Sequence, residues 1–561
     1  MQITINGKVC ECKEGETILQ VARRNKIKIP TLCYLKGIIE DSSCRVCMVE
    51  NVDNHKLLTA CSTRCFDGLN VNTKSPAVIK SRVDTLKMLL SNHHKNCDEC
   101  VKNHKCALQK LFNEYGITKT PDYYQKQHFE IDNSSPCILR NDNKCILCGR
   151  CVAVCKKTQA VSALVKQQRG FKSFVGCAFD KPLAQSTCVG CGQCTLVCPT
   201  GALLENSEID DVKRALADKE TLVYAQVAPS VRVSLAEYFG EPIGTFDEGR
   251  MVTALKKLGF DKVFDVNMGA DVTVKEESEE LLDRIKRNKR LPLFSSCCPA
   301  WFKYVQNMYP EHTEYLSSCK SPTEMLGAII KNYYTTKENI PEQKIKVVGI
   351  MPCTAKKGEK QRGKDVDYVL TTRELAKLIS DSDIDYLHLR ETPFDDPFSM
   401  YSGAGLIFGV TGGVTEAVLR SVCRSLNKND ERVDFEEVRN SGGRKEVTVT
   451  CGDLKLNLCV VNGLRNAKEV MDDIIEGKVK YHFVEVMACP GGCLNGGGQN
   501  YVDYSEVDVE DVKHLRATSL YNKDREINNR ISTENENLKK LYADFFIPSP
   551  KKAKEILHYR H

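Results

Sequence analysis

Cysteines are the residues of this chain whose number and spacing point most clearly to chemistry. The chain has 561 residues, of which 29 are cysteine. Its first residues do not resemble a secretion signal, and no run of roughly 18 apolar residues predicts a transmembrane helix. We therefore expect a soluble, cytoplasmic protein, and in a reducing cytoplasm thiols do not persist as disulfides. Most of these cysteines are predicted to bind metal.

The strongest pattern is Cys-x2-Cys-x2-Cys-x3-Cys, which occurs at 145–155 and again at 188–198. This spacing is typical of bacterial ferredoxins, in which the fourth cysteine of each run binds the other cluster. Zinc is the alternative, but zinc takes four thiolates in two pairs rather than two such quartets. We expect two [4Fe–4S] clusters, one on Cys145, Cys148, Cys151 and Cys198, and one on Cys188, Cys191, Cys194 and Cys155.

A second set of cysteines follows a predicted small domain at the N-terminus. Residues 2–12 are predicted to form two short strands around Asn6-Gly7, and a helix is expected from about Thr17. This order indicates a β-grasp ferredoxin domain with one [2Fe–2S] cluster, and zinc is the alternative. The predicted ligands are Cys33, Cys44, Cys47 and Cys61.

A third set contains a histidine. A helix over 76–94 is predicted to bury Ile79, Val83, Leu86 and Leu90 on one face. It leads to the predicted ligands of a further [4Fe–4S] cluster, His93, Cys97, Cys100 and Cys106. Three cysteines with one histidine also suit zinc, but iron–sulfur sites flank this set on both sides. His94 is the competing ligand.

The later cysteines fall in three phrases, SSCCPAW at 295–301, MPCTAKK at 351–357 and EVMACPGGCLNGGGQ at 485–499. Together these resemble the three signature segments of [FeFe]-hydrogenases, and the resemblance, to the monomeric clostridial type, spans essentially the whole chain. It implies an H-cluster, which is a [4Fe–4S] cube joined to a di-iron unit with CO, CN⁻ and an azadithiolate bridge. The implied ligands of the cube are Cys298, Cys353, Cys489 and Cys493.

The resemblance also implies a proton relay and a set of groups around the di-iron unit. The relay residues are Cys297, Glu277, Ser317, Glu280 and, near the exit, Arg284. Glu277, Glu280 and Arg284 share one face of a helix predicted over 274–287. Without the resemblance, a charged helix face of this kind would be expected to be exposed to solvent. Lys356 and Ser230 would donate to cyanides, while Pro229, Met351 and Met487 would pack around the di-iron unit. Residues 402–413 lack the dinucleotide-binding glycine spacing and are expected to form a pocket wall.

These sites require several structural units. We expect α+β iron–sulfur domains at 1–78, 79–125 and 126–208, followed by an α/β catalytic domain of two lobes at 209–561. Segments 291–295, 347–351 and 481–488 are predicted to be buried strands, each ending at a cysteine loop, as in parallel sheets whose sites form at the carboxyl ends of strands. Nine cysteines are left without a role: Cys10, Cys12, Cys65, Cys137, Cys177, Cys319, Cys423, Cys451 and Cys459.

The implied activity is the reversible reduction of protons to H₂. Residues 1–130 hold 20 Lys and Arg against 14 Asp and Glu, which equals the net charge of +6 and suits an acidic ferredoxin or flavodoxin as electron carrier. Hydrogenase maturation proteins are the other expected partners, and we expect a monomer without nucleic acid or membrane contacts. The alternatives are an electron-transfer subunit like that of NADH dehydrogenase, an iron–sulfur assembly protein, a sensory hydrogenase and an electron-bifurcating subunit.

Overall fold

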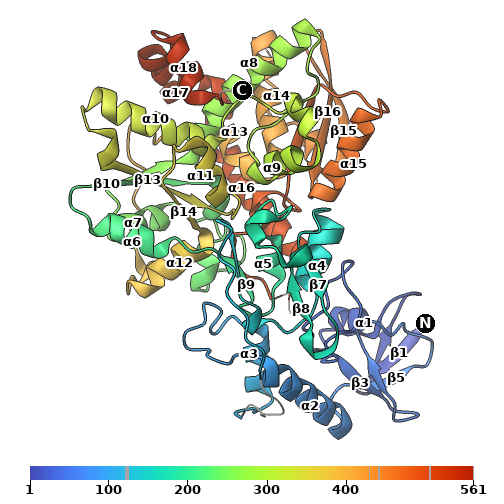
Figure 1. Ribbon diagram of the computed structural model, residues 1–561. Coiled ribbons are helices and arrows are strands. Elements are labelled where there is room, and N and C mark those ends of the chain that lie inside the picture. Colours follow the sequence, from blue (N-terminus) through green and yellow to red (C-terminus); the bar gives the residue numbers. More distant parts are fainter. Residues whose placement is uncertain (120–125, 429, 440–441, 504–506, 560–561) are drawn as a thin grey trace.

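The computed structural model describes residues 1–119, 126–428, 430–439, 442–503 and 507–559. The expected end of the second unit, at residue 125, lies outside them. Figure 1 shows two lobes in the upper part of the molecule and the N-terminal segments below them. None of the helices in the described ranges combines the length and the apolar character needed to cross a membrane.

The first unit is a five-stranded sheet covered by one helix. Its strands, in spatial order, are β2 (Lys8–Glu11), β1 (Gln2–Ile5), β5 (Asn70–Asn72), β3 (Met48–Asn51) and β4 (Leu57–Thr59). The predicted hairpin is confirmed, because Asn6 and Gly7 both adopt positive φ between β1 and β2. The predicted helix start is also confirmed: Thr17 caps α1 (Ile18–Arg24) in a reciprocal capping box with Gln20.

The helix before the histidine set is α2 (Pro76–Asn92), and its predicted apolar face was partly wrong. Ile79 is 44% exposed, whereas Val78 is buried together with Leu86 and Leu90. The buried stripe also includes Arg82, which donates to the Met48 carbonyl at 2.7 Å. An arginine inside the stripe hid the true face from a pattern that counts only apolar side chains.

The third unit consists of two small antiparallel strand pairs and short helices. Strand β6 (Ile138–Arg140) pairs with β9 (Leu203–Glu205), and β7 (Val165–Gln167) pairs with β8 (Phe174–Gly176). Helices α4 (Arg150–Ala153) and α5 (Gln193–Val197) each follow a glycine with positive φ inside one of the two cysteine runs.

The two upper lobes each contain a four-stranded sheet, seen to the left and right in Figure 1. The first is parallel, in the order β11 (Lys262–Asp265), β10 (Leu222–Val227), β13 (Ile345–Met351) and β14 (Tyr368–Thr371). The second runs β12 (Leu293–Phe294), β17 (Phe483–Met487), β16 (Leu454–Asn462) and β15 (Arg444–Cys451), with only β15 antiparallel. The three predicted buried strands are confirmed, divided between the two sheets.

Helix α8 (Val266–Arg287) joins the lobes. Its first half is buried all round, and it packs against α10 (Pro322–Lys337) of one lobe and α14 (Gly413–Leu426) of the other. Such all-round burial explains why the first half is mostly apolar or small. Within it, the charged residue Asp271 is buried and accepts a hydrogen bond from the Ser402 N–H at 2.9 Å. The remaining helices are α3 (Ala107–Glu114), α6 (Ile209–Ala217), α7 (Gly249–Lys257), α9 (Pro299–Met308), α11 (Lys356–Gly363), α12 (Thr372–Asp381), α13 (Gly403–Leu406), α15 (Leu464–Ile475), α16 (Val509–Glu526), α17 (Glu536–Leu541) and α18 (Pro550–Leu557).

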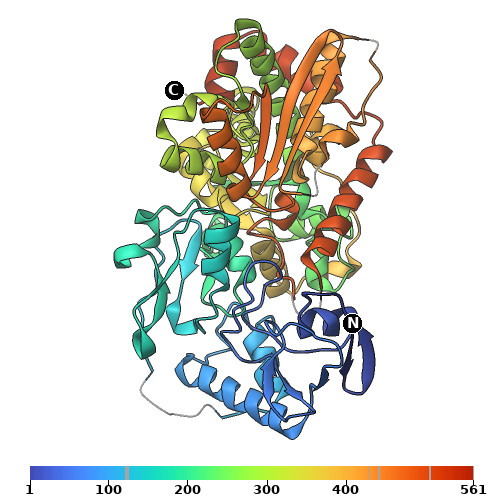
Figure 2. The same cartoon turned by 90° about the vertical axis from the view of Figure 1, so that its right-hand side faces the viewer.

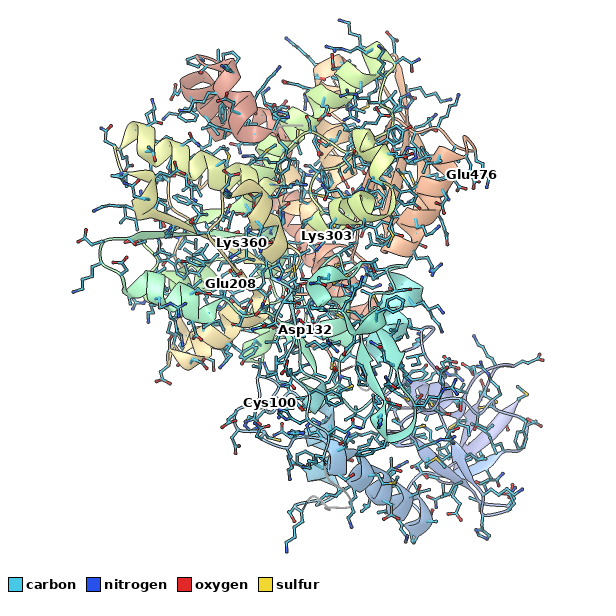
Figure 3. The ribbon with its side chains drawn as sticks, in the orientation of Figure 1. Cys100, Asp132, Glu208, Lys303, Lys360 and Glu476 are labelled. Atoms are coloured by element: carbon cyan, nitrogen blue, oxygen red, sulfur yellow. A yellow bond between two sulfur atoms is a disulfide. The ribbon has the colours of Figure 1, made fainter. Side chains whose placement is uncertain are left out.

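Ion pairs connect the lower units to the lobes. Glu208, which precedes α6, pairs with Lys360 of α11 at 2.8 Å, and Figure 3 shows the two residues near the centre of the molecule. Figure 2 shows the N-terminal unit below α16, where Lys36 pairs with Asp508 at 2.8 Å.

Two of the nine cysteines that the sequence left without a role are bonded to each other. Cys423 on α14 and Cys451 at the end of β15 form a disulfide, with Cα atoms 4.6 Å apart. They are 28 residues apart and lack a metal-ligand spacing, so only the packing of α14 on the second sheet brings them together.

Candidate active site

Strands of both sheets end at one cavity between the lobes. Strand β10 ends just before Pro229 and Ser230, β13 before Cys353, β12 before Cys297 and Cys298, and β17 before Cys489. The cavity is lined by all the residues that the hydrogenase resemblance assigned to the cluster pocket, namely Cys297, Cys298, Cys353, Cys489, Cys493, Lys356, Ser230, Pro229, Met351 and Met487. Phe408 and Gly409, from the predicted pocket wall, line it too.

Two polar groups in this cavity have unused hydrogen-bonding capacity. The Ser230 hydroxyl is fully buried and has no partner among the described residues. The Lys356 ammonium donates to Ser321 Oγ at 2.7 Å and to Glu359 Oε2 at 2.6 Å, which leaves one of its three N–H groups. An unpaired buried polar group costs about 1–3 kcal/mol, so these donors indicate a ligand with acceptor atoms.

The chemistry of the donor set fits an H-cluster. Four thiols converge from distant loops, as a cube requires, and the two free donors lie beside the apolar side chains of Pro229, Met351 and Met487. In the loop that carries Cys493, the glycines pack too closely against neighbouring atoms to admit a side chain. A Cβ at Gly496 would lie 2.2 Å from the Pro352 carbonyl oxygen.

The first half of the expected proton relay is buried beside this cavity. Glu277 accepts a hydrogen bond from the Ser296 N–H at 2.6 Å, and its other oxygen has no partner within the described part of the chain. Burial raises the pKa of Glu277 to about 7 and raises the pKa of Cys297 well above its usual value. A carboxyl that titrates near neutrality can take up and release protons with little change in free energy, while the buried thiol stays in its neutral form.

The second half of the relay surrounds Glu280. Ser317 Oγ donates to Glu280 Oε2 at 3.2 Å, and Arg284 Nη2 donates to Oε1 at 2.6 Å. Arg284 is only 7% exposed, and its other N–H groups bond the carbonyls of Arg290, Tyr315 and Leu316. The sequence analysis expected Arg284 near the exit, but the structure encloses it.

The ferredoxin-like runs form two further thiol-lined cavities. One is lined by Cys145, Cys148, Cys151 and Cys198, and the other by Cys155, Cys188, Cys191 and Cys194. Each cavity therefore takes its fourth cysteine from the other run. The spacing of the cysteines predicted the same grouping, and the ligand roles stay predictions.

The two N-terminal sets also converge. Cys33 lies within hydrogen-bonding reach of Cys44 and Cys61, and Cys47 lies within reach of Cys61. All four thiols are buried.

In the histidine set, His93 is buried and its Nδ1 has no partner among the residues that the structure describes. Burial lowers the pKa of His93 to about 4, which keeps the imidazole neutral, as a metal ligand must be. The competing His94 already uses Nε2 in a hydrogen bond with the Gln127 carbonyl at 2.8 Å.

Contacts join both N-terminal sets to the cavity of Cys145, Cys148, Cys151 and Cys198. Cys33 and Cys148 share one apolar cluster, and Cys106 Sγ lies 3.5 Å from the carbonyl of Pro199, next to Cys198. The 188–194 loop meets the catalytic loops directly. Thr354 Oγ1 donates to the Gly190 carbonyl at 2.6 Å, and Cys191 itself lines the central cavity.

Sequence reasoning missed three residues beside Glu280. These are Ser318, Glu276 and, near the C-terminus, His558. Ser318 and Glu276 adjoin relay residues that the sequence analysis did name. His558 had no local signal, because it lies 240 residues from Ser318 in the chain.

Comparisons with known families divide the chain as follows. Residues 1–76 match a 2Fe-2S iron-sulfur cluster binding domain, 82–121 the iron-sulfur binding region of NADH-ubiquinone oxidoreductase-G, and 144–202 a 4Fe-4S dicluster domain. Residues 221–497 match the C-terminal domain of the iron only hydrogenase large subunit, and 510–561 match the iron hydrogenase small subunit.

Individual relatives agree with these matches. NADP-reducing hydrogenase subunit HndD of Solidesulfovibrio fructosivorans is 42% identical over 100% of this chain and 98% of its own length. Iron hydrogenase 1 of Clostridium pasteurianum is 40% identical over 100% of this chain and 99% of its own. Among solved structures, an apo [FeFe]-hydrogenase HydA1 variant from Chlamydomonas reinhardtii matches with a TM-score of 0.56 and 35% identity, over 63% of this chain and 98% of its own. The chain belongs to the iron-only, or [FeFe], hydrogenase family, with that family's catalytic domain preceded by 2Fe–2S and 4Fe–4S cluster domains.

Proposed function

We propose that this enzyme reduces protons to H₂ reversibly, with electrons from a ferredoxin or flavodoxin that pass through accessory clusters to an H-cluster between the lobes. The observation that carries the proposal is the cavity that gathers Cys298, Cys353, Cys489 and Cys493 around unpaired polar donors. Four cysteines from strand ends of two separate sheets are otherwise hard to explain, since nothing in folding alone requires them to meet.

The bound H-cluster would supply the metal centre at which two protons and two electrons combine to H₂. Cys298, Cys353, Cys489 and Cys493 would hold its cube, with Cys493 bridging to the di-iron unit. Lys356 and Ser230 would orient its cyanides through their unused donors. Pro229, Met351 and Met487 would exclude water from the pocket, which strengthens those hydrogen bonds.

Protons would move between Cys297 and solvent through Glu277, Ser317 and Glu280. The raised pKa of Glu277, about 7, suits transfer in both directions near neutral pH. Arg284 would hold Glu280 in place, because it donates two hydrogen bonds to Oε1 of that carboxylate.

Electrons would pass through one [2Fe–2S] and three [4Fe–4S] accessory clusters, on the ligands named above, within the proposed units 1–78, 79–125 and 126–208. The contact of the 188–194 loop with Thr354 supports this order, because it puts the proposed second ferredoxin-type cluster next to the catalytic cavity. The basic excess of residues 1–130 supports an acidic carrier, although Lys36 is already paired with Asp508.

A second candidate concerns the electron acceptor. The full-length relative at 42% identity is named as a subunit of an NADP-reducing hydrogenase. This chain would then work in a complex, with electrons going to a partner that reduces NADP, rather than as a cytoplasmic monomer served by ferredoxin. The rate of electron exchange between the isolated chain and ferredoxin distinguishes the two candidates. Exchange should be rapid if ferredoxin is the carrier, and slow if the chain works only in an NADP-reducing complex.

The test of the proposed activity needs the di-iron unit, which maturation proteins would insert. The matured chain should evolve H₂ from reduced viologen and show infrared stretches of CO and CN⁻. If both the bands and the H₂ are absent after insertion, the proposal is wrong. A chain with the bands but no H₂ would contradict the activity while keeping the cofactor.

A further inference from the structure

The proton relay as proposed has no outlet at Arg284. A guanidinium has five N–H donors and no acceptor, and it stays protonated in proteins. In Arg284 all five are used, on Glu280 Oε1 and on the carbonyls of Arg290, Tyr315 and Leu316. A proton that reaches Glu280 therefore needs another neighbour to continue to the surface.

The structure offers such a neighbour on the opposite oxygen of Glu280. Ser318 Oγ lies 3.0 Å from Glu280 Oε2 and 2.9 Å from His558 Nδ1. The other ring nitrogen of His558, Nε2, lies 3.0 Å from Glu276 Oε2. These contacts form one continuous hydrogen-bonded chain, and at its outer end the side chains of His558 and Glu276 are 19% and 15% exposed.

We propose that Ser318, His558 and Glu276 form the solvent branch of the proton relay, with His558 as its proton-carrying residue. This branch rests on the proposed hydrogenase function and extends it by the three residues that the sequence analysis did not name. It would place the outer end of the relay in the segment that matches the iron hydrogenase small subunit, since His558 lies within 510–561.

The transfer needs no group beyond those present. During H₂ evolution Glu276 gives a proton to Nε2 of His558, the Nδ1 proton passes to Ser318 Oγ, and the Ser318 hydroxyl proton passes to Glu280 Oε2. Glu276 thus loses one proton to the chain and Glu280 gains one. Ser318 Oγ gains one and loses one, and His558 gains one at Nε2 and loses one at Nδ1, so the imidazole returns to the neutral form in its other tautomer. Rotation of the ring resets the tautomer for the next proton, and H₂ oxidation uses the same bonds in reverse.

Backbone contacts hold this chain in place. Lys320 N–H donates to the Leu557 carbonyl at 2.8 Å, and Tyr559 N–H donates to the Ser318 carbonyl at 2.9 Å. His558 is thereby fixed opposite Cys319, although it follows the last helix, α18. A side chain that only filled surface space would not require this two-sided attachment.

The charged and titratable groups around His558 come from four segments. Glu276 and Glu280 face it from α8, and the Cys319 thiol lies in the same cluster. Tyr542 donates to Glu276, and Lys275 lies 4.4 Å from the Tyr542 ring centroid. On the far side, Arg362 lies over the ring of the adjacent Tyr559. Two carboxylates thus face the imidazole, and the Arg284 guanidinium binds one of them, Glu280, while Lys275 and Arg362 lie over aromatic rings.

The test compares His558→Gln with His388→Gln in the matured enzyme. His388 pairs with Asp385 at 2.9 Å but is 82% exposed, so it is a matched histidine–carboxylate pair outside the relay. We expect His558→Gln to lower kcat of H₂ evolution by at least about tenfold and to change its pH profile, with the KM for reduced viologen unchanged. Free imidazole should restore much of the rate, and Glu276→Gln should cause a similar loss.

Two results would overturn the branch: wild-type kcat in His558→Gln across the pH range, or a loss that imidazole does not relieve. A second measurement does not depend on activity. It follows the NMR signals of the histidines against pH in the chain lacking the di-iron unit, where Glu280→Gln should shift the pH midpoint of the His558 titration. No shift would contradict the coupling, even if His558→Gln failed to fold. If the matured wild type makes no H₂, the proposed function itself fails, whereas an active wild type with an unaffected His558→Gln removes only the branch.

Discussion

The lower units and the two lobes both gather cysteines, but they do so in different ways. The two ferredoxin-type quartets lie within 145–198, and each N-terminal set lies within about 30 residues of chain. The quartet of the central cavity extends from Cys298 to Cys493, and its members follow strands of two separate sheets. Short loops therefore make the first kind of site, and the topology of a whole domain makes the second.

This difference also separates the chemistry of the two regions. The lower thiol sites also have charged neighbours, such as Arg140 and Asp142 beside the quartet of Cys145, Cys148, Cys151 and Cys198, but these two side chains are paired with each other at 2.6 Å. Cys297 and Lys356 line the central cavity, and Glu277 accepts a hydrogen bond from the backbone N–H of Ser296, next to Cys297, as suits a reaction that moves protons. The following predictions test whether the two regions are as distinct as these contacts indicate.

The largest effect is expected from removing a ligand of the central cavity. Cys489→Ser should abolish H₂ evolution and leave the accessory clusters in place, because the proposed ligands of those clusters lie in loops outside the lobes. H₂ production and EPR spectra of the reduced accessory clusters measure the two effects. The matched control is Cys459→Ser, a fully buried thiol of β16 outside the cavity, which should remain active. Normal activity of Cys489→Ser would contradict the assignment.

The next effect concerns Cys297, which lines the cavity but is not needed as a ligand. Cys297→Ala should keep its iron and its infrared bands while losing roughly 10²–10⁴-fold in turnover, because the proton donor is removed. H₂ assays on matured protein measure this loss. Full activity would refute the proton role, whereas loss of iron would indicate that Cys297 is a ligand after all.

A smaller effect should appear in stability. The pKa of Glu277 is about 7 in the fold against 4.5 in an unfolded chain, so its stability contribution is complete below pH 4.5 and is lost as the pH rises to about 7. Glu277→Gln should therefore become more stable relative to wild type over that window, by about 3 kcal/mol at the upper end. Chemical unfolding at several pH values measures the difference, and a difference independent of pH would contradict the burial of an ionisable group there.

The smallest effect should come from salt. If the basic excess of residues 1–130 steers an acidic carrier, the rate with ferredoxin should fall several-fold as salt rises from low to physiological concentration. The rate with reduced viologen provides the control, because that small cation is not attracted by a basic surface. A ferredoxin rate that does not respond to salt would remove the steering argument.

The same contrast explains how much the sequence could predict. The spacing of Cys145 to Cys155 predicts its site locally, since a short loop can wrap a cluster without contacts from distant parts of the chain. The meeting of Cys298 with Cys493 was available only through the family resemblance, because no local rule joins residues so far apart. His558 and the Cys423–Cys451 disulfide had no signal of either kind, and both depend on packing between distant segments. The prediction that Ile79 is buried was wrong for a different reason. The buried face of α2 includes Arg82, so a count of apolar residues did not select that face.

The claim that the fold assembles a cluster site between the lobes is tested most directly by counting iron. Protein produced without maturation proteins should hold the cube of the central cavity but not the di-iron unit. Wild type should then contain about 18 iron atoms per chain, four from each of four cubes and two from the [2Fe–2S] cluster, and Cys353→Ser about 14. Equal iron in wild type and Cys353→Ser would contradict the account.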